Sequence, residues 1–180
     1  METVALFGGS FDPPHLGHVA IVEALEKLNF IDKIIIVPAF LNPFKTKTYA
    51  SSQQRLAWLH CLFDANKKVC IEDYELNAKR KVSSIETVNY LYHRYKKIYL
   101  VIGADNVKTL KMWNHFEVLD SKVTFIVAPR NQIEIPKKFI TLDVDEEVSS
   151  TELREEINIK KISKKCAQEI AQHYKEYNAK

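Results

Sequence analysis

The chain has 180 residues, of which 46% are hydrophobic, and its formal net charge at pH 7 is +3. This length and hydrophobic share predict a folded domain with a buried core and exclude a disordered chain. The charge is too small to indicate nucleic-acid binding, and the short basic runs at 79–81 and 160–161 are interpreted as solvated faces. The three cysteines form no CxxC pair, and the sequence shows neither a signal-peptide pattern nor a membrane-spanning run, so we expect a cytoplasmic protein that binds no membrane.

The first predicted element is a buried strand at 4–7, which ends in a glycine pair at 8–9. A short loop follows, and a helical pattern then runs from 18 to 28. His15 and His18 are three residues apart at the start of this helix, so both side chains can face the same side. Glycines allow a ligand to approach the backbone closely, and a helix N-terminus attracts anions. This unit therefore predicts a phosphate-binding site.

Strands and helices alternate along the rest of the chain. Apolar runs rich in β-branched residues predict strands at 34–37, 69–71, 98–102, 123–127 and 139–142. Helical patterns lie between them, and a last helix with one apolar packing face is expected at 163–177. This order predicts an α/β fold with a doubly wound, mostly parallel sheet and helices on both faces. We expect a single domain over 1–180, with the segment from about 149 to 180 packed on it.

Three helix starts carry the pattern of a capping box. The pairs are Ser51 with Gln54, Ser83 with Glu86, and Ser149 with Glu152. At the last of them, hydroxyl side chains occupy 149–151 and Arg154 follows one turn later. N–H groups, hydroxyls and a guanidinium can bind an anion together. The pattern therefore indicates either a structural cap or a second phosphate site.

Ligands of parallel α/β sheets bind beyond the carboxyl ends of the strands. Five loops lie there in the predicted order, at 8–18, 38–47, 72–84, 103–105 and 128–130. The unusual residues of the sequence fall in these loops. Asp105 is one of them, and it either caps a helix or accepts hydrogen bonds from ribose hydroxyls. The sequence thus predicts a ligand site at this edge of the sheet.

The string GGSFDPPHLGH at 8–18 resembles the signature of the HxGH nucleotidyltransferases, and above all the form found in bacterial nicotinate-nucleotide adenylyltransferases. The stretch VSSTELR at 148–154 is similar to the ISSTxxR motif of the same superfamily, and the resemblance covers about residues 3–157. It implies a Rossmann-like fold and transfer of AMP from ATP to nicotinate mononucleotide, in NAD biosynthesis. The implied partners are ATP and a pyridine mononucleotide. Mg²⁺ is expected on their phosphates, with no metal ligand from the protein.

The resemblance also implies roles for single residues. His18 and His15 would be the catalytic pair, with His18 donating to the α-phosphate. ATP and its phosphates are assigned to Gly8, Gly9, Ser10, Phe11, His15, His18, Lys45, Gly103, Asp105, Arg130, Ser149, Ser150, Thr151 and Arg154. The mononucleotide is assigned to Ser84, Thr87, Trp113 and Lys45.

The middle of the chain matches the family pattern more loosely. The segment DYEL at 73–76 resembles the family's DxEL, and Lys45 matches the lysine of its PPHK loop. Phe44 stands where that loop has a histidine, and residues 82–84 replace the family's Ser-Tyr-Thr, so the pocket wall is expected to differ.

The implied reaction requires no general base, because the attacking phosphate oxygen is already anionic at pH 7. Catalysis would then consist of positioning and of charge stabilisation at the α-phosphorus. The alternatives are adenylyl transfer to nicotinamide mononucleotide or phosphopantetheine, a non-catalytic nucleotide sensor on the same fold, and a metal-binding regulator that uses His15 and His18. The sequence leaves the oligomeric state open, a homo-oligomer included.

Overall fold

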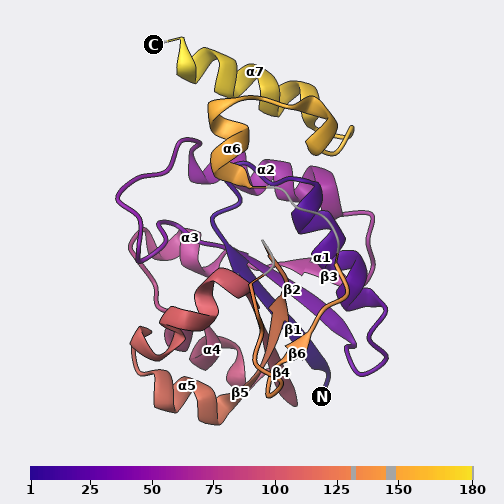
Figure 1. Ribbon diagram of the computed structural model, residues 1–180, viewed down its shortest axis with the longest axis vertical. Coiled ribbons are helices and arrows are strands. Elements are labelled where there is room, and N and C mark those ends of the chain that lie inside the picture. The colour runs from indigo at the N-terminus through magenta and orange to yellow at the C-terminus, as the bar shows by residue number, and fades with distance from the viewer. Residues whose placement is uncertain (131–132, 145–148, 180) are drawn as a thin grey trace.

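The computed structural model describes residues 1–130, 133–144 and 149–179. Within these residues, six strands form one sheet in the order β3-β2-β1-β4-β5-β6, and every neighbouring pair is parallel (Figure 1). The strands are β1 (Thr3–Gly9), β2 (Lys33–Pro38), β3 (Val69–Ile71), β4 (Lys97–Gly103), β5 (Val123–Ala128) and β6 (Ile140–Thr141). This is the strand order of a doubly wound Rossmann-type sheet, so the predicted fold class is confirmed.

Helices cover both faces of the sheet. They are α1 (Leu16–Glu26), α2 (Ser52–Phe63), α3 (Tyr74–Ala78), α4 (Ser84–Tyr92), α5 (Phe116–Lys122), α6 (Ser150–Glu155) and α7 (Ala167–Asn178), with 3₁₀ helices η1 (Ala104–Met112) and η2 (Ile159–Lys161). Side chains of a strand point alternately to its two faces. In β1, Ala5 and Phe7 enter a core shared with α1, α2 and α7, whereas Val4 and Leu6 enter a second core shared with α4 and α5.

The C-terminal helices belong to the first of these two cores. Leu153 of α6 and Tyr174 of α7 are buried in it beside residues of α1 and α2. The apolar face predicted for the last helix is confirmed, since Ala167, Ile170, Ala171 and Tyr174 are its buried residues. In Figure 1, α6 and α7 lie next to α2, at the end of the molecule opposite α5.

Several element boundaries differ from the prediction. Helix α1 begins at Leu16, so His15 is its N-cap, and the helical region expected at 105–119 is divided into η1 and α5. Helix α3 lies inside the segment that was predicted as the loop 72–84. The sequence did not predict this helix, because five residues are too few to show a helical repeat.

Two of the three predicted capping boxes form. Ser51 with Gln54 and Ser83 with Glu86 make the reciprocal bonds. Ser149 is the N-cap of α6, but its side chain makes no capping hydrogen bond, so the third box was predicted wrongly. Among the residues that the structure describes, no helix is long and apolar enough to cross a membrane.

Candidate active site

The site lies where the order of the strands reverses. From β1 the chain moves first to one side, to β2, and later to the other side, to β4, so the ends of β1 and β4 flank a crevice. A cavity of about 190 Å³ opens there, with Gly8, Gly9 and Gly103 in its lining. Four of the five loops predicted from the sequence contribute to this lining, namely 8–18, 38–47, 72–84 and 103–105. The predicted edge of the sheet is therefore hollowed.

The two histidines meet at the start of α1. The backbone N–H of His15 donates to Nδ1 of His18 over 3.1 Å, and the two rings stack with centroids 3.7 Å apart. The ring of Phe11 packs against His18, with centroids 4.8 Å apart. Phe11 has a left-handed φ of 49°, which a bulky residue keeps only when its surroundings fix it. The prediction that both histidines face the same side is confirmed.

Both imidazoles are neutral at pH 7. Burial lowers the pKa of His15 to about 3, and the charges of Arg130 and Lys161 act in the same direction. Burial lowers the pKa of His18 well below its usual 6.5, and His15, Arg130 and Lys45 add to this effect. Because a backbone N–H can only donate, Nδ1 of His18 is the acceptor in its bond with His15. The proton of the neutral ring is therefore on Nε2, which makes Nε2 a hydrogen-bond donor.

Cationic side chains approach this pair from separate segments of the chain. Lys45 follows β2, Arg130 follows β5 and Lys161 ends η2. Desolvation and the charge of Arg154 lower the pKa of Lys45, which indicates that α6 brings Arg154 close to the same region. Positive charges that disfavour a protonated imidazole attract an anion to the same place. The surroundings of the histidines are thus suited to phosphate groups.

The end of β4 carries a paired carboxyl group. Oδ2 of Asp105 lies 3.5 Å from Nη1 of Arg130, and half of the Asp105 side chain is exposed. A Cβ at Gly103 would lie 2.5 Å from Oδ1 of Asp105, so a larger residue there would make the carboxyl group of Asp105 shift. The N-cap of η1 is Gly103, so the alternative in which Asp105 caps the helix is wrong. Asp105 remains accessible to a ligand at this strand end.

Two buried charged residues hold the loop between β1 and α1. Arg55 of α2 is fully buried and donates to the carbonyl oxygen of Ser10 over 2.7 Å, and also to two carbonyls just after β2. The carboxyl group of Asp12 accepts the N–H groups of Tyr49 and Ala50 at 2.7 and 2.9 Å. The loop that carries the histidines is therefore bound to the loop after β2.

Helix α6 reaches the same loop from the C-terminal side. The hydroxyl of Ser150 donates to the carbonyl oxygen of Pro13 over 2.9 Å. Arg154 donates to the carbonyl oxygen of Asp12 at 2.6 Å and to the hydroxyl of Thr151 at 3.0 Å. Part of the hydrogen-bonding capacity of this motif thus fixes the loop.

The residues predicted for the mononucleotide lie at different depths. Ser84 and Trp113 line the cavity, and Nε1 of Trp113 is buried without a hydrogen-bond partner within the described ranges. Thr87 lies behind the cavity wall, where its hydroxyl donates to Glu75 over 2.5 Å. Glu75 itself lines the cavity. It was not predicted as a site residue, although the DYEL resemblance pointed to its segment.

The roles of three other charged residues near the site were also not predicted from the sequence. Lys161 was interpreted as part of a solvated face, but its charge acts on His15. Arg55 and Asp12 were not predicted to be buried; Asp12 lies inside the motif at 8–18, whereas no local pattern in the sequence distinguishes Arg55 from a surface charge.

Comparison with known proteins gives first the class and then the family. The family model described as cytidylyltransferase-like matches residues 6–156. A protein of Sulfurimonas denitrificans named "Probable nicotinate-nucleotide adenylyltransferase" is 57% identical over 180 residues, which cover 100% of this chain and 99% of the relative. A protein of the same name from Campylobacter jejuni is 47% identical over 174 residues, which cover 95% and 96%. The chain therefore belongs to the cytidylyltransferase-like family and, within it, to the nicotinate-nucleotide adenylyltransferases.

Solved structures share the fold. The nicotinic acid mononucleotide adenylyltransferase of Plasmodium falciparum complexed with NaAD has a TM-score of 0.78 at 21% identity, covering 99% of this chain and 97% of that chain. A structure of the same protein complexed with APC has a TM-score of 0.73 at 18% identity, with coverage of 99% and 96%.

Proposed function

We propose that this protein transfers the AMP group of ATP to nicotinate mononucleotide, giving nicotinate adenine dinucleotide and pyrophosphate. The observation that carries the proposal is the pair of neutral histidines beside Gly8 and Gly9, surrounded by cations at the point where the strand order reverses. The relatives named as nicotinate-nucleotide adenylyltransferases support this substrate, and so does the similar Plasmodium falciparum structure, which is complexed with NaAD.

In this proposal a phosphate oxygen of the mononucleotide attacks the α-phosphorus of ATP. A P–O bond forms to the attacking oxygen, and the bond between the α-phosphorus and the bridging oxygen breaks, so pyrophosphate leaves with the electron pair. Nε2–H of His18 donates to an oxygen of the α-phosphate, where negative charge accumulates. A neutral donor fixed by its neighbour loses no energy to reorientation during the reaction, which is the basis of electrostatic preorganisation.

The phosphates of ATP extend from the histidines towards the cations. Arg130, Arg154, Lys45 and the hydroxyls at 149–151 are the proposed contacts of the β- and γ-phosphates. Asp105 is the proposed acceptor for a ribose hydroxyl, because its carboxyl group is half exposed at the end of β4. Ser84 and Trp113 are the proposed contacts of the pyridine nucleotide, because they line the cavity beyond the glycines.

Mg²⁺ is the proposed metal ion, held through the phosphates of ATP and through water. Within the described residues, no group of three or more His, Cys, Asp or Glu side chains is arranged to hold a metal. A metal that arrives with the triphosphate fits such a site, since Mg²⁺ keeps several waters and favours phosphate oxygens. When bound, it would neutralise part of the charge on the leaving pyrophosphate.

The test is pyrophosphate release from ATP and Mg²⁺ with nicotinate mononucleotide, nicotinamide mononucleotide or phosphopantetheine as acceptor. We expect release with nicotinate mononucleotide and the adenine dinucleotide as co-product. Binding of ATP without release of pyrophosphate for any acceptor would contradict the proposal and favour a nucleotide sensor.

A further inference from the structure

The cavity beside the glycines contains a carboxyl group for which the proposed reaction has no use. Glu75 of α3 is only 8% exposed, yet it belongs to the lining of the cavity together with Ser83, Ser84 and Trp113. Its Oε1 accepts the hydroxyl of Thr87. Within the described ranges, Oε2 accepts no hydrogen bond, so this residue of the cavity lining has one carboxyl oxygen without a protein donor.

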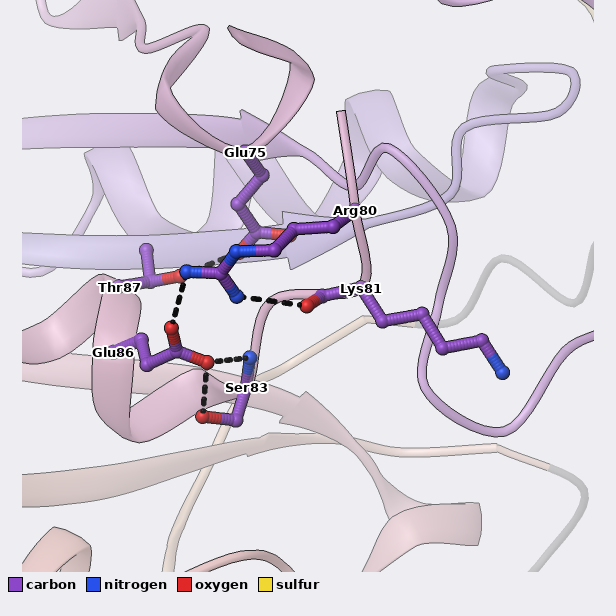
Figure 2. A network of polar contacts seen from close by, with 6 residues as sticks. All are labelled: Glu75, Arg80, Lys81, Ser83, Glu86 and Thr87. Atoms are coloured by element: carbon purple, nitrogen blue, oxygen red, sulfur yellow. Dashed lines mark hydrogen bonds and ion pairs between the residues drawn. The ribbon is translucent and has the colours of Figure 1, made fainter. Parts of the chain in front are cut away.

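A second glutamate stands next to it at the start of α4. Oε1 of Glu86 accepts the N–H and the hydroxyl of Ser83 at 3.1 and 3.0 Å, and Oε2 accepts Arg80 at 2.8 Å (Figure 2). The hydrogen bond from Arg80, with those from Ser83, lowers the pKa of Glu86 to about 2. Glu86 is therefore ionised throughout the neutral pH range.

The environment of Glu75 acts in the opposite direction. Burial raises the pKa of Glu75 to about 7, and the charge of Glu86 adds to this, whereas the bond from Thr87 opposes it. The guanidinium of Arg80 is bound to Glu86 and to the carbonyl of Lys81. Figure 2 shows Glu75 reaching from α3 towards Thr87 while Arg80 faces Glu86. When two neighbouring acids have pKa values this far apart, the one with the raised pKa takes the proton.

The mononucleotide can occupy this cavity in one direction only. Its phosphate carries the attacking oxygen, so it must lie at the glycine and histidine end. The pyridine ring then extends away from that end along the cavity, whose lining includes Glu75, Ser84 and Trp113. The ring substituent of nicotinate is a carboxylate, and that of nicotinamide is an uncharged amide. A third negative charge beside Glu75 and Glu86 is unfavourable unless one of the acids is neutral.

We propose that Glu75 determines which pyridine nucleotide the site prefers: as a neutral acid it donates to the ring carboxylate of nicotinate mononucleotide, and as a carboxylate it repels that group and accepts from the amide of nicotinamide mononucleotide. The inference rests on the proposed function. It predicts that the preference for the nicotinate form decreases as the pH rises.

The experiment measures kcat/KM for both mononucleotides with saturating ATP and Mg²⁺ between about pH 6 and pH 8.5. Its readout is the ratio of the nicotinate value to the nicotinamide value. Both substrates have the same phosphate and ribose and meet the same histidines, so the titration of those groups cancels in the ratio. We expect the ratio to fall by about tenfold or more over this range, because ionisation removes the acid that accepts nicotinate.

Two variants separate selectivity from folding. In Glu75→Gln the amide oxygen keeps the bond from Thr87 and the NH₂ group points into the cavity, so we expect a high ratio that no longer changes with pH. Glu72→Gln is the matched control, because Glu72 pairs with Arg94 outside the cavity, and its ratio should follow the wild-type profile.

A pH-independent ratio in the wild type would overturn the inference, and so would a Glu75→Gln ratio that keeps the wild-type slope. If Glu75→Gln does not fold, the wild-type profile alone decides. A protein that releases pyrophosphate with nicotinate mononucleotide but shows a flat ratio contradicts only the role of Glu75. A protein that releases none with this substrate at any pH contradicts the proposed function as well.

Discussion

The hydroxyl of Tyr174 donates to the carboxyl group of Asp12 across 162 residues of sequence, with 2.5 Å between the oxygens. Tyr174 lies on α7 and is fully buried, whereas Asp12 lies in the loop that leads to the histidines. The same carboxyl group accepts two N–H groups of the loop after β2. Asp12 thus connects the last helix with two loops of the active site, and this gives α7 a positioning role in addition to its packing role.

The variant Tyr174→Phe tests this role. It keeps the ring in the core and removes one donor from a buried carboxyl group, so we expect a loss of about 1–3 kcal/mol in the free energy of unfolding. We also expect a higher KM for ATP, because the carbonyl oxygen of Asp12 binds Arg154, a proposed contact of the β- and γ-phosphates. Urea unfolding and steady-state kinetics measure both. Tyr177→Phe is the control, since its hydroxyl accepts a hydrogen bond from the exposed Lys47 at 3.3 Å; an equal effect of the two variants would contradict a specific role of Tyr174.

The glycine at position 8 is suited to a test of close ligand approach. A Cβ at Gly8 would have its nearest neighbour, the carbonyl oxygen of Val37, at 3.9 Å, so the free protein can accommodate a methyl group. The variant Gly8→Ala should therefore fold normally but lose ATP affinity, since the methyl group would occupy space that we assign to a phosphate. Thermal unfolding and ATP binding by calorimetry are the measurements. Full ATP affinity in a stable Gly8→Ala protein would show that the phosphates lie elsewhere.

The fold could be predicted from the sequence because its determinants are local. The strand at 34–37 is continuous in β-branched residues, and in the structure β2 is covered on both faces, which is the condition that favours such a run. His15 and His18 lie together although His15 is the extended N-cap residue of α1, because the hydrogen bond from the N–H of His15 to His18 is also local in sequence.

The supporting residues of the site could not be predicted, because their roles depend on contacts distant in sequence. Arg55 is buried only because carbonyl groups of two other loops converge on its guanidinium. Glu75 becomes a cavity residue through α3, whose length hides its helical pattern, and through Thr87 of another helix. The burial of charged side chains is decided by tertiary structure, which residue type and spacing do not reveal.

The buried imidazole of His15 predicts a loss of stability in acid. Its pKa is about 3 in the folded protein and about 6.5 in the unfolded chain, so below pH 6.5 the unfolded state binds the additional proton. Each pH unit below 6.5 then removes up to about 1.4 kcal/mol, and His18, whose pKa is also lowered, acts in the same direction. Glu75 opposes them between pH 7 and 4.5, because its folded pKa is raised. Because the two histidines destabilise the fold in acid and only Glu75 opposes them, these three groups together lower the free energy of unfolding as the pH falls.

The variant His15→Asn isolates the contribution of His15, because Asn is a good N-cap and does not titrate. Between pH 7 and pH 5 we expect the wild type to lose up to about 2 kcal/mol more stability than the variant, measured by urea unfolding at both pH values. Equal losses in the two proteins would show that His15 accepts its proton freely in the folded state.

The donor role of His18 gives the sharpest test of the mechanism. In His18→Ala the donor to the α-phosphate is lost, and removal of one such donor costs about 10²–10³ in rate. We expect kcat for pyrophosphate release to fall by this factor, with the thermal unfolding temperature close to that of the wild type. His18→Gln should recover part of the rate, because its amide nitrogen can occupy the place of Nε2. His60→Ala is the matched control, since His60 is an exposed histidine on α2 that pairs with Asp64. A folded His18→Ala protein with a kcat near that of His60→Ala would remove His18 from the mechanism and leave charge stabilisation to the cations.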